Sequence, residues 1–276
     1  MVEPDINYSL PPPSVPQKLP LVGVKNIIAV YACKGGVGKS TISTNLAVAL
    51  GLQGEKTGLL DADVHGPNIP LMMGVADRPL VSESNKITPL EAHGIKFMSL
   101  GVLKDVRIPL IWRGPMVHGA VQQLLRDTQW GELDFLIIDF PPGTGDAQLT
   151  VAQSVPLAGV LFVTTPQKVS LADGVKGLGM FQKLKIPILG LVENMSGFTC
   201  PECHHVTDIF SKGGGEEQAK EWGIPFLGTV PLDPSIVVGS DTGKPLVATN
   251  PESPAAQTIF KMAKKIAAQM KSVHIL

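Results

Sequence analysis

Residues 26–41 read NIIAVYACKGGVGKST, which is a short apolar run, a turn with three glycines, and a lysine followed by two hydroxyl residues. Glycine lets successive backbone amides point toward the oxygens of a phosphate group, because no Cβ atom stands in the way. A helix that opens near Lys39 would add its polarised amino end to the same anion site. The complete GxGKST ending, placed between a strand and a helix, indicates a P-loop rather than a glycine-rich turn that binds nothing.

Each residue of this loop has an expected role. Lys39 would contact the β- and γ-phosphates, and the Ser40 hydroxyl would ligate Mg²⁺. A dinucleotide-binding GxGxxG pattern cannot be drawn, because Thr41 stands where the third glycine should be. Cys33 replaces the usual first glycine, and we interpret it as a small structural residue. The predicted nucleotide contacts are Gly35, Gly36, Val37, Gly38, Lys39, Ser40 and Thr41.

The rest of the chain predicts an α/β fold with a mostly parallel sheet and helices on both faces. Near-continuous apolar runs alternate with longer segments of helical period, as in sheets that are buried on both sides. The runs are residues 26–32, 57–63, 95–100, 134–140, 159–165, 187–194 and 225–230. We therefore predict a single P-loop domain over residues 24–276, preceded by a proline-rich arm over residues 1–23.

Composition restricts the partners. The chain has 23 lysines and arginines against 24 acidic residues in 276, so bulk charge does not indicate nucleic acid or an anionic membrane as a partner. The apolar runs are too short to span a bilayer, and the first ten residues lack the pattern of a signal peptide. Near the end, Ile259, Ala263, Ile266 and Met270 recur at helical spacing. This helix is expected to pack on the sheet rather than on a membrane. We expect a cytoplasmic protein, with the mitochondrial matrix as the alternative, although no transit peptide is recognised.

Carboxylates follow two of the predicted strands. Asp61 and Asp63 end the run TGLLDAD, and Asp139 ends LIIDF before a proline and glycine turn. Ligands of open α/β sheets bind at these carboxyl ends. Nucleotide hydrolysis needs a carboxylate near Mg²⁺ and a group that orients water, and we assign Asp139 to the first role and Asp63 to the second. The plain alternative for an isolated aspartate is a helix cap.

Two of the three cysteines form a CxxC pair, Cys200 and Cys203. A two-residue spacer lets both thiolates face one metal ion or one cluster. A four-thiolate site needs two chains, since Cys33 belongs to the P-loop turn, and this arithmetic indicates a symmetric dimer. Structural zinc remains open, either bridged by four cysteines or with His204 or His205 contributing. The pair also matches the haem pattern CxxCH, which we discount because nothing indicates export.

These segments carry a family resemblance. CKGGVGKST resembles the deviant Walker A motif of the ParA/MinD class, with Lys34 as its extra lysine. The remaining motifs resemble the Mrp/ApbC family of iron–sulfur cluster carriers over about residues 24–266. They are DADVHGPNIP (61–70), WRGPM (112–116), PPGTGDAQLT (141–150), ENMSGFTCPEC (193–203) and GGGEE (213–217).

The resemblance implies an ATP-hydrolysing homodimer, or a related heterodimer, in which Lys34 reaches across to the partner's nucleotide. It further implies ATP, Mg²⁺, a labile bridging [4Fe–4S] cluster on Cys200 and Cys203, and apo iron–sulfur proteins as recipients. Asn194 would contact the adenine, with an ordinary loop cap as the alternative. One eukaryotic branch has extra amino-terminal cysteines that this chain lacks, which implies a single cluster site. The alternatives are a ParA/MinD-like positioning ATPase, which the CxxC and the lack of a basic patch disfavour, and an ATPase with a structural bridging zinc.

Overall fold

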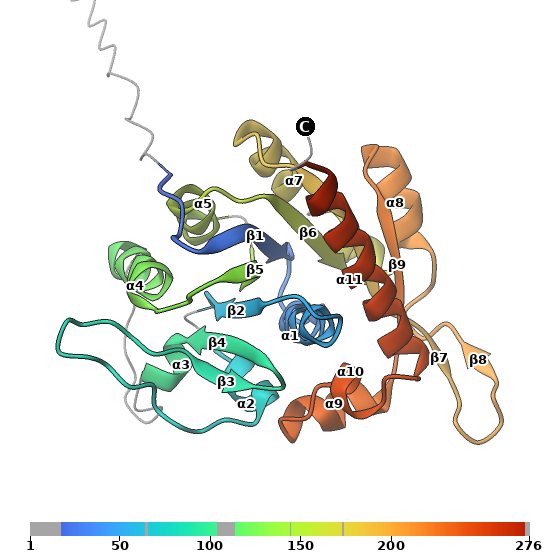
Figure 1. Cartoon of the computed structure of the whole chain (residues 1–276). Helices are drawn as coiled ribbons and strands as arrows, with labels where there is room; N and C mark the ends of the chain where they lie inside the picture. Colours follow the sequence, from blue (N-terminus) through green and yellow to red (C-terminus); the bar gives the residue numbers. More distant parts are fainter. Residues whose placement is uncertain (1–17, 64–65, 104–113, 144, 173, 274–276) are drawn as a thin grey trace, which may run out of the picture.

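The computed structural model describes residues 18–63, 66–103, 114–143, 145–172 and 174–273 (Figure 1). Most of the proline-rich arm lies outside this range, as do Trp112 and the residue that follows it in the WRGPM motif.

The described residues form one nine-stranded sheet in the order β3-β4-β2-β5-β1-β6-β7-β8, with β9 also paired to β7. The seven strands from β4 through β2, β5, β1, β6 and β7 to β9 are parallel, while β3 and β8 run antiparallel to their neighbours. The prediction of a mostly parallel sheet is therefore confirmed. The strands are β1 (Val24–Tyr31), β2 (Thr57–Asp61), β3 (Leu90–Ala92), β4 (Ile95–Ser99), β5 (Leu133–Asp139), β6 (Gly159–Thr164), β7 (Ile188–Thr199), β8 (Val206–Thr207) and β9 (Phe226–Leu232).

Two separate apolar cores lie on the two faces of the sheet. Alternate residues of β1 point to opposite sides, so that Ile28 packs in one core and Ile27 in the other. The first core includes buried side chains of α1 and α11, and the second includes side chains of α4, α5 and α7. This double burial explains why the central strands read as continuous apolar runs.

The helices of the described residues follow the strands as the alternating pattern predicts. In the last of them the positions at helical spacing, Ile259, Ala263, Ile266 and Met270, are at most 5% exposed, which confirms packing on the sheet. No helix among the described residues has the length and apolar character that crossing a membrane requires. The helices are α1 (Lys39–Leu52), α2 (Ile69–Met73), α3 (Leu100–Leu103), α4 (Gly114–Asp127), α5 (Asp146–Ser154), α6 (Lys168–Ala172), α7 (Gly174–Lys183), α8 (Gly214–Trp222), α9 (Pro234–Asp241), α10 (Leu246–Thr249) and α11 (Pro254–Val273).

Strand register brings the functional segments together. Asp139 of β5 lies beside Val30 of β1 on one side and beside Asp61 of β2 on the other. Because these strands are parallel, their carboxyl ends meet at the edge of the sheet where the glycine-rich loop leaves β1.

Candidate nucleotide site and thiol pair

The loop between β1 and α1 has the backbone geometry of an anion nest. Gly36 and Gly38 have φ angles of +81° and +83°, a region that glycine enters without strain, and α1 begins directly afterwards at Lys39. Val37, between the two glycines, is buried in the apolar core and anchors the loop. The amides at the start of α1 carry no side-chain cap from Gly38, so this helix end can accept an anion.

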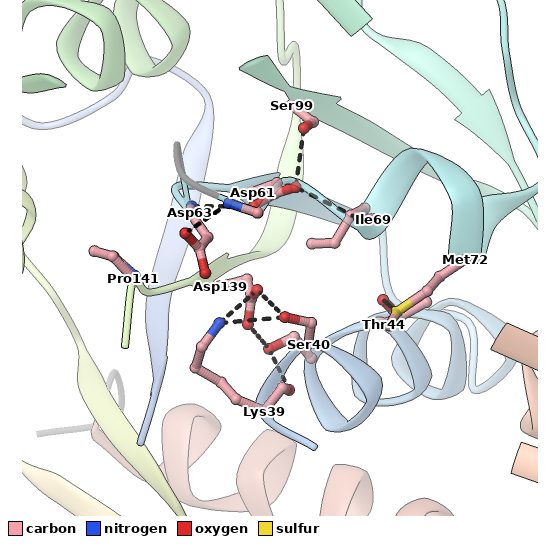
Figure 2. A network of polar contacts seen from close by, with 12 residues as sticks. Lys39, Ser40, Thr44, Asp61, Asp63, Ile69, Met72, Ser99, Asp139 and Pro141 are labelled. Carbon is pink, nitrogen blue, oxygen red and sulfur yellow. Dashed lines mark hydrogen bonds and ion pairs between the residues drawn. The ribbon is translucent and has the colours of Figure 1, made fainter. Parts of the chain in front are cut away.

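Asp139 ties the end of β5 to the first turn of α1 (Figure 2). Its carboxylate is fully buried and accepts hydrogen bonds of 2.6 Å from the Ser40 hydroxyl and 2.6 Å from the Ser43 hydroxyl. The Lys39 ammonium lies 2.6 Å from the same carboxylate and is itself buried. Hydroxyl and carboxylate oxygens are ligands that Mg²⁺ accepts, and Ser40 and Asp139 place such a pair beside the loop.

Ser43 was missed by the sequence reasoning. It lies one helical turn after Ser40, on the same side of α1, and this i, i+3 spacing of hydroxyls after the P-loop lysine could have revealed it.

Asp61 and Asp63 differ in their surroundings. Asp61 is buried and accepts hydrogen bonds from the Ser99 hydroxyl at 2.9 Å and from the backbone amide of Asp63 at 3.0 Å. Burial, with a second contribution from the nearby Asp139 carboxylate, raises the pKa of Asp61 to about 8. Asp63 is only half-buried and accepts a bond from the Gly66 amide. Asp61 therefore anchors the segment after β2, while Asp63 is the more accessible carboxylate.

Lys34 and Lys39 lie in different environments. Lys39 is buried against Asp139, whereas Lys34 is half-buried and is followed by the exposed Gly35 and Gly36. Lys34 is therefore the more accessible of the two lysines.

Asn194, a buried residue near the middle of β7, holds the loop from the other side. Its side-chain amide donates a hydrogen bond of 2.9 Å to the Val37 carbonyl, and a Cβ atom on Gly38 would overlap that amide. A pocket of about 220 Å³ opens beside this contact. Three of its lining residues, Gly38, Thr41 and Asn194, were predicted from the sequence, whereas those that come from β9 and α9 were not. The pocket is lined by Gly38, Thr41, Asn194, Met195, Pro231, Leu232, Asp233, Ile236, Val237 and Ser240.

The two clustered thiols lie at the tip of a hairpin. Strand β7 continues past Asn194 as far as Thr199 and pairs with β8, and Cys200 and Cys203 lie in the turn between them. Backbone hydrogen bonds of 2.9 Å between Cys200 and His204 and between Cys200 and His205 close this turn. Cys203 is exposed and Cys200 is half-buried. Hydrogen bonds from the Cys203 and Glu202 backbone lower the pKa of the Cys200 thiol, which favours the thiolate that binds metals.

The third cysteine lies elsewhere. The Cys33 thiol is half-buried at the start of the P-loop, 3.5 Å from the Tyr31 hydroxyl, and packs against the second apolar core. This placement agrees with a structural role for Cys33.

A buried carboxylate that sequence reasoning did not single out fixes the segment after the hairpin. Glu193 of β7 accepts hydrogen bonds from the backbone amides of Gly213 and Gly215 and from the Ser196 hydroxyl. Glu193 therefore caps the start of α8. The glycines of the GGGEE segment leave room for this contact, since a side chain on Gly215 would press on Glu193.

Comparison with known proteins agrees with this geometry. A family profile described as "ParA: NUBPL iron-transfer P-loop NTPase" matches residues 23–267. The iron-sulfur cluster transfer protein NUBPL of Dictyostelium discoideum is 51% identical over 93% of this chain and 80% of its own length. The iron-sulfur cluster carrier protein of Pseudomonas fragi is 48% identical over 94% of this chain and 91% of its own.

Solved structures show the same fold. A nucleotide-binding protein from Archaeoglobus fulgidus, determined in complex with ADP, has a TM-score of 0.71 and 39% identity over 80% of this chain and 88% of its own. The cell division ATPase MinD of Pyrococcus furiosus has a TM-score of 0.67 and 25% identity over 89% of this chain and 99% of its own. These findings confirm the resemblance to the iron–sulfur carriers of the ParA/MinD class. The chain belongs to the ParA family, as a P-loop NTPase of the NUBPL iron-transfer type.

Proposed function

We propose that this protein is an ATP-hydrolysing carrier that holds a labile [4Fe–4S] cluster between two subunits and transfers it to apo-proteins. One observation carries the proposal: a single strand, β7, contacts the P-loop at Asn194 and ends at Thr199, directly before Cys200. The relatives named for cluster carriage or transfer support the same reading. Thiolate ligands of this kind suit a reducing compartment such as the cytoplasm or the mitochondrial matrix.

The residues of the loop fit ATP and Mg²⁺. The left-handed glycines and the uncapped amides of α1 suit phosphate oxygens, and the pocket beside Asn194 suits a planar base. Ser40 would ligate Mg²⁺ directly, with Asp139 in its outer shell. The metal would neutralise charge on the phosphates. In this arrangement Lys39 binds phosphate and the half-buried Asp63 orients the attacking water.

The dimer follows from the number of thiolates. One chain offers Cys200 and Cys203 at an exposed turn, while Cys33 is packed beside the P-loop. A four-thiolate cluster therefore needs the same pair from a second copy, on a two-fold axis. Lys34, the more accessible of the two lysines, would contact the partner's nucleotide. ATP would then bias the dimer between arrangements that hold and release the cluster.

Anaerobic reconstitution tests the cluster. The dimer should bind about four iron and four sulfide, with broad absorption near about 400 nm. Cys200→Ala and Cys203→Ala should each abolish the colour and the transfer of cluster to an apo-ferredoxin. Cys33→Ala is the matched control and should keep both. A colourless dimer holding zinc, or a cluster that survives Cys203→Ala, would leave the ATPase standing and refute the carrier function.

Two serines offer a paired test of the nucleotide site. Ser40→Ala and Ser43→Ala each remove one hydroxyl that donates a hydrogen bond of 2.6 Å to the Asp139 carboxylate. The two variants should therefore lose similar amounts of folding free energy. Only Ser40→Ala should abolish Mg²⁺-dependent binding of ATP, as measured by calorimetry with and without Mg²⁺. Equal loss in both variants would refute the role of Ser40 as the metal ligand.

Lys34→Gln tests the contact between subunits. The variant should bind ATP and lose its hydrolysis, because the lysine serves the partner's site. In a mixed dimer of Lys34→Gln with a second hydrolysis-deficient variant, the site that receives an intact Lys34 from its partner should regain activity. If no activity returns, and ATP binding by Lys34→Gln falls together with hydrolysis, then Lys34 acts within its own subunit.

A further inference from the structure

Helix α11 lies next to strand β9, away from the P-loop (Figure 1). A groove runs between the two elements. Its volume is about 550 Å³. Leu227, Gly228 and Thr229 of β9 form one wall, and Thr258, Lys261, Lys264, Lys265 and Ala268 of α11 form the other. None of these residues belongs to the nucleotide site or to the hairpin that carries the thiols.

The strand wall is an edge of the sheet. Among the described residues β9 pairs only with β7, so the backbone groups on its other side are not used by another strand. An exposed strand edge is a template for a further strand, and proteins usually protect such edges. Here α8 covers the opposite face of β7 and β9, while α11 runs along the near face and leaves the groove beside it.

The helix wall is positively charged and has no counter-charge in the described part of the chain. Lys261, Lys264 and Lys265 are exposed, and no ion pair joins them to a described carboxylate. Farther along the same helix, Lys271 by contrast lies 2.6 Å from Glu55. The groove itself has no acidic lining residue. Its charge therefore favours an acidic occupant, and its strand edge favours an extended one.

We propose that this groove binds an extended acidic segment of a partner protein, which adds to β9 as a further strand and places its carboxylates against Lys261 and Lys265. The proposal does not depend on the nucleotide or on the cluster. The groove would be a docking surface for a partner protein that carries an exposed acidic segment.

Spacing makes the expected sequence more specific. Thr258, Lys261, Lys265 and Ala268 lie on one stripe of α11, whose length of about 15 Å accommodates four or five extended residues. The Cα atoms of Lys261 and Lys265 lie about 6 Å apart along the helix axis, close to the repeat of about 6.6 Å between alternate residues of a strand. The segment should therefore carry acidic residues at alternate positions on the side of α11, with apolar residues between them that point to the opposite face of the sheet, where α8 packs.

An anionic membrane is the other surface that three lysines could meet. Membrane-bound helices place large apolar side chains below their basic face. Residues 254–272 of α11 expose no large apolar side chain, because those of the helix are buried against the sheet. The structure therefore favours the peptide.

The test uses the full chain and a fluorescein-labelled peptide of sequence GSDVDVDSG, with binding measured by fluorescence anisotropy at low salt. The double variant Lys261→Gln, Lys265→Gln should bind about fivefold more weakly, as expected for the loss of two exposed ion pairs. Ala268→Glu, at an exposed helix position in the groove, should weaken binding as well. Lys220→Gln, which removes a charge from the exposed face of α8, is the matched control and should leave binding unchanged.

Two peptide controls separate strand addition from simple charge attraction. The rearranged peptide GSDDDVVSG and a peptide with alternate backbone amides methylated should both bind more weakly than the alternating peptide. Equal binding of the rearranged or methylated peptide would overturn the proposal. An equal loss of peptide affinity in Lys220→Gln would overturn it as well. So would a protein that does not bind the peptide but sediments with phosphatidylserine vesicles, if the double variant reduces that sedimentation.

Discussion

Replacing Gly38 with alanine tests how tightly Asn194 fixes the P-loop. Gly36 and Gly38 have nearly the same backbone conformation, with φ of +81° and +83°. Their surroundings differ. A Cβ atom on Gly36 meets no described atom within 4 Å, whereas one on Gly38 overlaps the Asn194 side-chain amide. Gly36→Ala therefore reports the conformational cost alone, and Gly38→Ala adds the cost of displacing Asn194.

The difference between the two variants can be worked out from these contacts. An alanine in the left-handed region costs about 1–2 kcal/mol, which applies to both positions. At Gly38, Asn194 must also give up its hydrogen bond to the Val37 carbonyl, in a site where Asn194 is only 5% exposed. Leaving a buried polar group unsatisfied costs about 1–3 kcal/mol. Gly38→Ala should thus lower the free energy of unfolding by about 2–5 kcal/mol in total.

Urea unfolding followed by circular dichroism measures both variants side by side. Combining Gly38→Ala with Asn194→Ala removes the overlapping amide, and in that background Gly38→Ala should cost no more than Gly36→Ala. Equal destabilisation by Gly36→Ala and Gly38→Ala would refute the reasoning. So would an extra cost at Gly38 that persists when Asn194 is alanine.

Three further predictions concern buried charges. The raised pKa of Asp61 means that between pH 3.8 and about 8 the folded state keeps a proton that the unfolded state has already released, so the contribution to stability is complete below pH 3.8 and is lost as pH rises toward about 8. Asp61→Asn should flatten the pH dependence of the unfolding free energy over that range, and an unchanged slope would contradict the assignment. Lys39→Gln should cost about 3–5 kcal/mol by leaving the buried Asp139 carboxylate without its cation, and Asp139→Asn in the same chain should recover part of this in urea unfolding. Glu193→Gln should lower Tm by about 4–8 °C in calorimetry, since about 2 kcal/mol is lost when an amide replaces the carboxylate that caps α8, whereas Glu217→Gln on the exposed face of α8 should leave Tm nearly unchanged.

The central sheet could be predicted because its strands are buried on both faces, so each reads as an apolar run with a clear end. The loop from Gly35 to Thr41 could be predicted because its glycines and hydroxyls act over a few adjacent residues. Neither of these predictions requires knowing which distant segment packs nearby. Strands β3 and β8 were missed, since they are short, partly exposed and defined only by antiparallel pairing with a neighbour.

The missed parts of the site depend on tertiary contacts. Residues 231–240 reach the P-loop only because β9 pairs with β7, and nothing in PLDPSIVVGS indicates that it lines a pocket beside that loop. Asn194 donates a hydrogen bond to the Val37 carbonyl, a contact that can be predicted only by knowing how close Gly38 lies. Its expected contact with adenine stays a prediction. The burial of Lys39 likewise follows from the position of Asp139 on β5.

Strand β7 connects the P-loop contact at Asn194 to the hairpin that carries the thiols, so a tilt of the strand would move the hairpin tip. Asn194 is fixed to the P-loop, and Cys200 follows the last residue of the same strand, six positions later. The two lie at most about 20 Å apart, the length of a fully extended segment of this size. Met195 and Gly197, which lie between Asn194 and Cys200, have left-handed backbone conformations. A tilt of only about 5° at the loop end moves the tip by about 2 Å over that length. This displacement is comparable to a metal–thiolate bond of about 2.3 Å. If a cluster binds at the hairpin as proposed, small rearrangements around a bound phosphate would be large enough at the tip to make or break a bond to sulfur.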